Sequence, residues 1–202
     1  MQRARGGAGS GTASRILDVA ERLVQTRGFN GFSYADVAER LKVTKAGLHY
    51  HFATKDDLGR ALIDRYADRF TASLGEVDRR ITDPLAKLEA YADLYAEVLQ
   101  GGRMCLCGML AAEYRTLPKP MQQAVIRFFD GNEAWLTTVL EEGRATGALG
   151  FTGSAAEAAR TIVSGLEGAM LVARPYGDPQ RFRSTAQRLV MSVAEPVVSP
   201  TP

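Results

Sequence analysis

Cysteine and histidine are scarce in this chain, with two of each among 202 residues. Cys105 and Cys107 lie two positions apart, so on one helix they point to nearly opposite sides and cannot pair. Two unpaired cysteines fit a reducing, cytoplasmic setting. His49 and His51 also diverge on a helix and have no third ligand nearby, so no metal site is expected. No nucleophile–base constellation or phosphate loop appears, and both histidines lie in one short segment, so we expect neither an enzyme nor a cofactor.

Long apolar runs are also missing, and this absence limits the contacts the chain can make. No stretch approaches 18 apolar residues, so no membrane partner is expected. The opening segment is basic but lacks the apolar core of a secretory signal. We therefore interpret residues 1–13 as a disordered basic arm, in which Arg3 and Arg5 could contact DNA, and residues 196–202 as a disordered tail.

Charge is unevenly distributed although the net charge is only +2. Residues 1–55 carry nine lysines and arginines against four acidic residues. A basic N-terminal quarter on a slightly acidic body suits a nucleic-acid-binding module joined to a second part, although such asymmetry also arises by chance.

The pattern of apolar residues predicts an all-α fold, because no convincing period-2 strand is found. Glycines, prolines and capping residues divide the chain into about nine helices. Helix 15–27 carries one apolar stripe, and Asp83-Pro84, Ser154 and Asp178-Pro179 each begin a later helix. Further helices are expected at about 103–115 and 121–146.

Two short helices joined by a tight turn predict a helix-turn-helix. Ser33 with Asp36 caps the first, Thr44 caps the second, and Thr54 with Asp57 caps the long helix that follows. The second helix would present its N-terminal residues to base edges in the major groove. The base-reading candidates are Thr44, Lys45, Ala46, Gly47 and His49. The phosphate-binding candidates are Ser33, Tyr34, Tyr50, His51, Thr54 and Lys55. Capped helices are common in all-α proteins, and the histidines with Tyr50 could be a structural cluster.

These residues carry a resemblance to the DNA-binding domain of the TetR family of transcription regulators. It runs through Ala20-Glu21-Arg22-Leu23, Phe32–Ala38, Val43–Phe52 and Thr54–Leu58, and covers about residues 14–62. The resemblance implies a helical C-terminal domain, a homodimer, a pseudo-palindromic operator and release by a small ligand. The chain departs from the family pattern at His49, where members often have Tyr, and at Lys42, where many have Gly. We expect a slightly strained turn, or a further phosphate contact, at Lys42.

The second half is expected to hold the ligand-binding and dimerisation functions. The stretch around Trp135 and 166–174 resembles the end of many members, whose last two helices form the dimer interface. The small residues Ala158, Gly165, Gly168 and Ala169 suit such an interface, or a tightly packed helix within one chain. The pocket candidates are Tyr66, Tyr91, Tyr95, Met104, Cys105, Met109, Phe128 and Trp135. Any one of them is more often core than pocket.

The segment 103–113 concentrates both cysteines and two of the six methionines. It resembles the Cys-Leu-x-Gly-x-Leu element of some members, a subset of which sense electrophiles through a thiol. Near the start of a helix and Arg103, Cys105 could have a lowered pKa and act as a sensor. Buried, inert cysteines in a core helix are the more common arrangement.

The sequence therefore predicts a ligand-responsive DNA-binding regulator with a helix-turn-helix domain at 14–58 and a ligand-binding and dimerisation domain at 59–195. We expect a repressor that binds double-stranded operator DNA as a homodimer and is released by a small, mainly apolar or electrophilic effector. The alternative is a helical interaction module that does not bind DNA.

Overall fold

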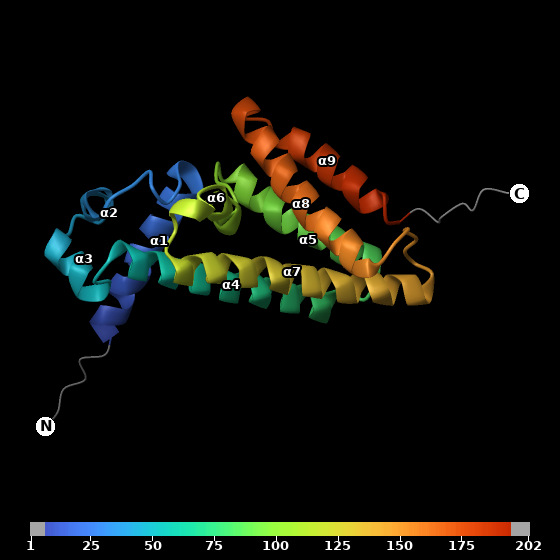
Figure 1. The fold of residues 1–202 in the computed structure, drawn as a ribbon, viewed down its shortest axis with the longest axis horizontal. Coiled ribbons are helices and arrows are strands. Elements are labelled where there is room, and N and C mark those ends of the chain that lie inside the picture. Colours follow the sequence, from blue (N-terminus) through green and yellow to red (C-terminus); the bar gives the residue numbers. More distant parts are fainter. Residues whose placement is uncertain (1–6, 195–202) are drawn as a thin grey trace, which may run out of the picture. The chain divides into compact units, whose positions relative to one another are not determined.

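A computed structural model of the chain describes residues 7–194, and all of the regular structure in that range is helical (Figure 1). Nine α-helices and two short 3₁₀ helices follow one another in this described part. They are α1 (Gly7–Arg27), α2 (Tyr34–Leu41), α3 (Lys45–His51), α4 (Lys55–Arg80), α5 (Pro84–Gln100), α6 (Leu106–Ala112), η1 (Tyr114–Thr116), α7 (Lys119–Thr146), α8 (Ala155–Ala173), η2 (Arg174–Tyr176) and α9 (Pro179–Met191). The predicted all-α class is confirmed.

The predicted capping residues begin most of these helices. Asp83 accepts from the backbone N–H of Ala86 at 2.8 Å, and Asp178 accepts from that of Gln180 at 2.9 Å. At α8 the Ser154 N–H donates to Glu157 at 2.9 Å, which completes a capping box. Each bond satisfies N–H groups that a helix start leaves without a partner.

Three helices, α1, α6 and α7, differ in their bounds from the sequence prediction. α1 begins at Gly7, so residues 7–13 are helical rather than part of a disordered arm. Adding residues to a helix already nucleated at 15–27 costs little, and this explains the extension despite the glycines. The arm residues 1–6 and the predicted tail 196–202 lie outside the described part. α7 begins two residues early and includes Pro120, which the first turn of a helix tolerates.

The expected helix 103–115 is shorter in the structure, where α6 spans only Leu106–Ala112. The end of α5 explains this, because Gly102 has φ 68° and the N–H of Arg103 donates back to the carbonyl of Val98 at 3.2 Å. Residues 103–105 have no regular secondary structure, so Cys105 lies just before α6 rather than within it.

The helices form two compact units, and each unit is built from two separate segments of the chain. The first combines residues 7–68 with 106–126, and the second combines 69–105 with 127–194. In the first unit α1 packs against α2, α3 and α6; in the second, α5, α8 and α9 pack together. The linear division at residue 58 therefore differs from these units, because α6 and the start of α7 return to the N-terminal helices. In residues 7–194 no helix is long and apolar enough to cross a bilayer.

Candidate DNA-binding surface and effector region

The turn between α2 and α3 fixes the geometry of the helix-turn-helix. Asp36 accepts from the backbone N–H and the hydroxyl of Ser33 at 2.8 and 2.7 Å, and these bonds lower the pKa of Asp36. At the other end of α2, Lys42 adopts a left-handed conformation with φ 56° and ψ 45°. The N–H of Val43 then donates to the carbonyl of Ala38 at 3.0 Å, which closes the helix end. Lys42 is the only non-glycine residue with positive φ in the described range, in agreement with the expected strained turn.

α3 is anchored by one side chain and leaves the rest of its surface open. Leu48 is buried at 1% exposure, whereas Thr44, Lys45, Ala46, Gly47, His49 and Tyr50 are all exposed. Thr44 accepts from the N–H of Gly47 at 3.2 Å, so its hydroxyl also caps the helix. Tyr50 is 86% exposed, and its ring meets His51 edge-on at 5.3 Å. The structure thus brings the base-reading candidates together on one accessible helix.

His49 and Tyr34 connect α3 to the elements around it. The His49 ring lies 4.8 Å from the ring of Tyr34, and its Nδ1 lies 3.0 Å from the carbonyl oxygen of Ala53. The Tyr34 hydroxyl donates to the carbonyls of Phe52 and Thr54, at 2.9 and 2.6 Å. Burial, with the charges of Asp57 and Asp56, raises the pKa of Tyr34 to about 12. Because the hydroxyl proton is used inside the domain, a phosphate contact by Tyr34 depends on its backbone N–H.

Lys55 is turned toward the interior of the first unit. Its ammonium donates to the carbonyls of Phe29 and Phe32 at 2.5 and 2.6 Å and lies over both phenyl rings at 4.5 and 4.4 Å. Burial lowers the pKa of this ammonium. The predicted phosphate contact of Lys55 therefore rests on its backbone N–H in the first turn of α4. The hydroxyl of Thr54 donates to the carboxylate of Asp57 at 2.7 Å, so a negative charge already lies at this helix start.

Sequence reasoning missed Glu113, whose carboxylate binds backbone N–H groups of the turn between α1 and α2. It accepts from the N–H of Phe29 at 2.5 Å and from that of Asn30 at 3.1 Å. Asn30 also donates through its side chain to the hydroxyl of Thr116 at 2.8 Å. Gly28 has φ 86°, and a Cβ there would lie 2.9 Å from Glu113. No local pattern indicates a contact that spans more than 80 residues.

Six of the eight pocket candidates lie in the second unit, and four of them belong to its aromatic core. The Phe70 ring meets those of Tyr91, Tyr95 and Phe128 edge-on, and Trp135 stacks on Tyr91 at 5.7 Å. The Tyr91 hydroxyl donates to buried Asn132 at 2.9 Å and lies 3.2 Å from that of Tyr95. Met104 and Cys105 are buried in the same unit, whereas Tyr66 and Met109 belong to the first.

Cys105 contacts the carboxylate of the half-buried residue Glu167, which the sequence did not single out. Its thiol is hydrogen-bonded to Glu167 of α8, and its backbone N–H donates to the sulfur of Met170 at 3.1 Å. Burial raises the pKa of Glu167 to about 7, against the opposing effect of the Cys105 bond. Oε1 of Glu167 is shielded from water and has no hydrogen-bond partner among the described residues. A buried polar atom without a partner is costly, so this site is a candidate for chemistry or binding.

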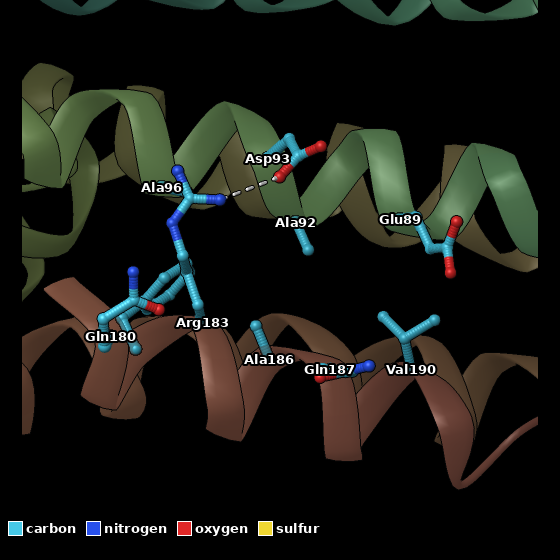
Figure 2. A pocket seen from close by; sticks show the side chains of 10 residues that line it. Glu89, Ala92, Asp93, Ala96, Gln180, Arg183, Ala186, Gln187 and Val190 are labelled. Atoms are coloured by element: carbon cyan, nitrogen blue, oxygen red, sulfur yellow. Dashed lines mark ion pairs between the residues drawn. The ribbon is translucent and has the colours of Figure 1, made fainter.

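An open cavity of about 410 Å³ lies between α5 and α9 (Figure 2). Its rim carries Glu89, Gln180 and Gln187, and Arg183 reaches across it to Asp93 at 3.9 Å. None of the predicted pocket residues lines this cavity. Its polar rim also differs from the apolar pocket that the sequence predicted.

The candidate dimer residues on α8 differ in their surroundings. Gly165 faces α9 of its own chain, because a Cβ there would lie 2.6 Å from Leu189. Gly168 is exposed and has open space beside it, while Ala158 and Ala169 are half-buried. Gly168 and Ala169 line a groove of about 390 Å³ with Val172, Ala173, Arg181, Ser184 and Thr185.

Comparisons with known proteins assign the family. Residues 16–62 match the model of bacterial regulatory proteins of the tetR family, and residues 84–189 match the tetracyclin repressor-like C-terminal domain. A TetR-family transcriptional regulator from Agrobacterium tumefaciens is 33% identical, with a TM-score of 0.89 over 93% of this chain and 100% of that one. The chain belongs to the TetR family of transcription regulators.

Further relatives agree with this assignment. The HTH-type transcriptional repressor NemR of Escherichia coli K12 is 28% identical over 193 residues, which is 93% of this chain and 96% of NemR. The crystal structure of reduced E. coli NemR has a TM-score of 0.79 at 24% identity, over 93% of this chain and 100% of that one. The predicted family and its DNA-binding regulatory role are thus confirmed, and the relatives are regulators rather than enzymes.

Proposed function

We propose that this TetR-family protein is a repressor that binds a pseudo-palindromic operator as a homodimer and leaves it when a small effector binds its second unit. The observation that carries the proposal is the exposed face of α3, where buried Leu48 anchors the helix and Lys45, Ala46, Gly47, His49 and Tyr50 are exposed. Small residues at Ala46 and Gly47 permit close approach to DNA, and Lys45 offers a cation to base edges.

The contacts with DNA divide into two groups in this proposal. Thr44, Lys45, Ala46, Gly47 and His49 read bases, with His49 using the ring edge turned away from Ala53. Tyr50 and His51 contact phosphate through their side chains. Ser33, Tyr34, Thr54 and Lys55 contribute through N–H groups near the starts of α2 and α4. Phosphate contacts set position, and base contacts set sequence preference.

Fluorescence anisotropy with DNA flanking the protein's own gene, or with a selected operator library, tests this proposal. We expect Lys45→Ala to weaken specific binding roughly 5- to 150-fold, the equivalent of about 1–3 kcal/mol for a lost base contact. Tyr50→Ala should weaken binding to all sequences alike. Lys119→Ala, which removes an exposed lysine from the start of α7, is the control and should bind normally.

Absence of salt-sensitive, sequence-specific binding by the wild type would contradict the repressor proposal. In that case the alternative of a helical interaction module without DNA would be supported.

The dimer is proposed to form through α8 and α9. Leu171 and Val172 are 59% and 62% exposed beside the groove at Gly168 and Ala169, and apolar side chains this open suit an interface. In this proposal Ala158, nearer the start of α8, belongs to the interface. Gly165 does not, because it packs against α9 of its own chain. Sedimentation velocity should show that Val172→Asp dissociates the dimer, while Gln123→Asp on α7 leaves it intact. A Val172→Asp protein that stays dimeric would contradict this interface.

The effector is proposed to act by shifting a population between DNA-binding and released states. It does so only through different affinities for the two states. We propose a small, mainly apolar or electrophilic compound near the aromatic core of the second unit. A thermal-shift screen against small aromatics, acids and electrophiles tests this, followed by release of DNA by each hit. Hits that stabilise the protein without altering DNA binding would contradict the effector role.

A further inference from the structure

The imidazole of His49 is held along one edge by the turn between α3 and α4. Its Nδ1 lies 3.0 Å from the carbonyl oxygen of Ala53, and its ring lies 4.8 Å from that of Tyr34, tilted by 50°. His49 is nonetheless exposed, and in the described part of the chain it makes no hydrogen bond other than the one to Ala53. The ring is therefore fixed at Nδ1 and open at Nε2.

The turn determines which ring nitrogen carries the proton. The Tyr34 hydroxyl donates to the carbonyls of Phe52 and Thr54. Nδ1 of His49 faces the carbonyl between them. A carbonyl oxygen accepts and never donates, so a contact of 3.0 Å requires the proton on Nδ1. A neutral imidazole has only one ring proton, which leaves Nε2 as an acceptor.

The neighbours of the ring keep this arrangement in place. Burial, with the charges of Asp57 and Asp56, raises the pKa of Tyr34 to about 12, so its hydroxyl remains a donor to the turn. Lys45 lies one turn before His49 on α3 and is also exposed. Residues four apart on a helix share a face. A donor that never accepts, Lys45, and an acceptor, Nε2 of His49, therefore lie side by side on the surface of α3.

We propose that His49 reads its operator as a hydrogen-bond acceptor, and that the base it faces presents an exocyclic amine, N6 of adenine or N4 of cytosine. The inference rests on the proposed function, because it specifies one base contact of the same DNA-binding surface. With Lys45 as donor, the pair matches a base acceptor next to a base amine.

The major groove separates the four bases on this criterion. Adenine N6 and cytosine N4 are donors there, whereas guanine and thymine present no donor. Against guanine O6 or thymine O4, Nε2 would set one lone pair against another and leave both groups without a partner. A phosphate oxygen is an acceptor too, so this tautomer also disfavours a contact with the DNA backbone. His49 is thus a specificity-determining residue in this inference.

The tautomer is measured first, in the free full-length protein. Long-range proton–nitrogen NMR of protein labelled with nitrogen-15 histidine, at pH 8 where free imidazole is neutral, distinguishes Nδ1–H from Nε2–H. A His51→Gln sample identifies the His49 signals. We expect the Nδ1–H form to predominate at His49 in the folded protein. It should lose that predominance in urea, where the contact with Ala53 is absent.

The base preference is measured next, by fluorescence anisotropy at the same pH with an operator selected from a random library. Each position is varied in both half-sites. We expect one position per half-site at which adenine or cytosine on one strand binds roughly 5- to 150-fold tighter than guanine or thymine, the usual range for one mismatched base pair. Removing only the amine, with purine for adenine or pyrimidin-2-one for cytosine, should weaken binding roughly 2- to 13-fold, as for one hydrogen bond.

A matched variant separates base reading from support of the turn. His49→Asn keeps a short side-chain N–H that can still donate to Ala53 but has no atom in the place of Nε2. It should retain the wild-type thermal melt yet lose the preference for adenine or cytosine, and removing the amine should change its binding less than about twofold. Gln123→Asn, an exposed change on α7, is the control and should retain both properties.

The inference is wrong if His49 is mainly Nε2–H in the folded protein, or if the position that depends on His49 prefers guanine or thymine. It is also wrong if His49→Asn weakens binding to all sequences alike, as loss of a phosphate contact would. If His49→Asn does not fold, the operators without the amine still decide with the wild type. A wild type that selects no operator contradicts the proposed function and this inference together, whereas a selective wild type that is indifferent to the amine contradicts this inference alone.

Discussion

Replacing Glu113 tests how the first unit holds its helix-turn-helix in place. The carboxylate accepts from two successive backbone N–H groups in the turn that leads from α1 into α2. The same turn is held from the other side by Lys55, whose ammonium binds the carbonyl of Phe29 while Glu113 binds its N–H. Both backbone polar groups of Phe29 are thus hydrogen-bonded to charged side chains.

The cost of Glu113→Ala follows from these two bonds. A hydrogen bond to a charged group contributes about 1.5–3 kcal/mol, and the N–H of Phe29 would remain half-buried without a partner. The N–H of Asn30 is exposed and can turn to water, so its loss costs less. We expect a total loss of about 2–4 kcal/mol in the free energy of unfolding, a large share of the 5–15 kcal/mol typical of a domain.

Urea unfolding followed by circular dichroism measures this loss. Glu39→Ala, an exposed change on α2, should stay within about 0.5 kcal/mol of the wild type. Glu113→Gln keeps one acceptor oxygen and should fall between the two. A cycle with Lys55→Met should reveal coupling, because both side chains act on Phe29. A Glu113→Ala protein as stable as the Glu39→Ala control would refute the reasoning.

Three further predictions concern single side chains. Lys42→Gly should stabilise the protein by about 0.5–1 kcal/mol, because glycine adopts the left-handed conformation freely. Lys42→Ala should give no stabilisation, and thermal melts of the two variants and the wild type measure the difference. The pKa of Asp36 is lowered on folding, so its capping contribution is complete above about pH 4 and is lost on acidification; the difference in Tm between wild type and Asp36→Ala should shrink between pH 6 and 3. The pKa of Glu167 rises from 4.5 to about 7 on folding, so the free energy of unfolding should fall as pH rises across that interval, by up to about 3.5 kcal/mol at about 1.4 kcal/mol per unit. Glu167→Gln should flatten this slope in urea titrations at pH 5 and 8.

Local features were predictable because local residues produce them. Ser33 with Asp36 and Ser154 with Glu157 are three residues apart, so each capping box can be found in the sequence alone. The exposed positions of α3 follow from helical spacing around Leu48, and the conformation of Lys42 follows from the shortness of the turn. For the same reason, the order of residues along the chain is enough to locate the helix-turn-helix.

Long-range contacts between polar residues were not predictable. Glu113 meets Phe29 across 84 residues, and Glu167 meets Cys105 across 62, with no spacing to connect them. Glutamate is a residue type usually found on helix surfaces, and only packing shows that Oε1 of Glu167 is shielded from water. The small residues of α8 give a similar lesson, because Gly165 and Gly168 look alike in sequence but face α9 and open space respectively.

The interleaved units lead to a last prediction, on a fragment that keeps only the N-terminal segment of the first unit. A protein ending at residue 68 would contain α1, α2 and α3 but would lack Glu113 and Met121. Met121 is buried at 1% exposure, and its side chain lies so close to Gly59 that a Cβ there would be 2.6 Å away. Losing this side chain removes about 1.5–3 kcal/mol of burial, in addition to the hydrogen bonds of Glu113. We therefore expect fragment 1–68 to unfold at much lower urea than the full chain, or to be unfolded in buffer, by circular dichroism. A fragment that unfolds cooperatively at the same urea concentration as the full chain would show that residues 106–126 do not stabilise the DNA-binding helices.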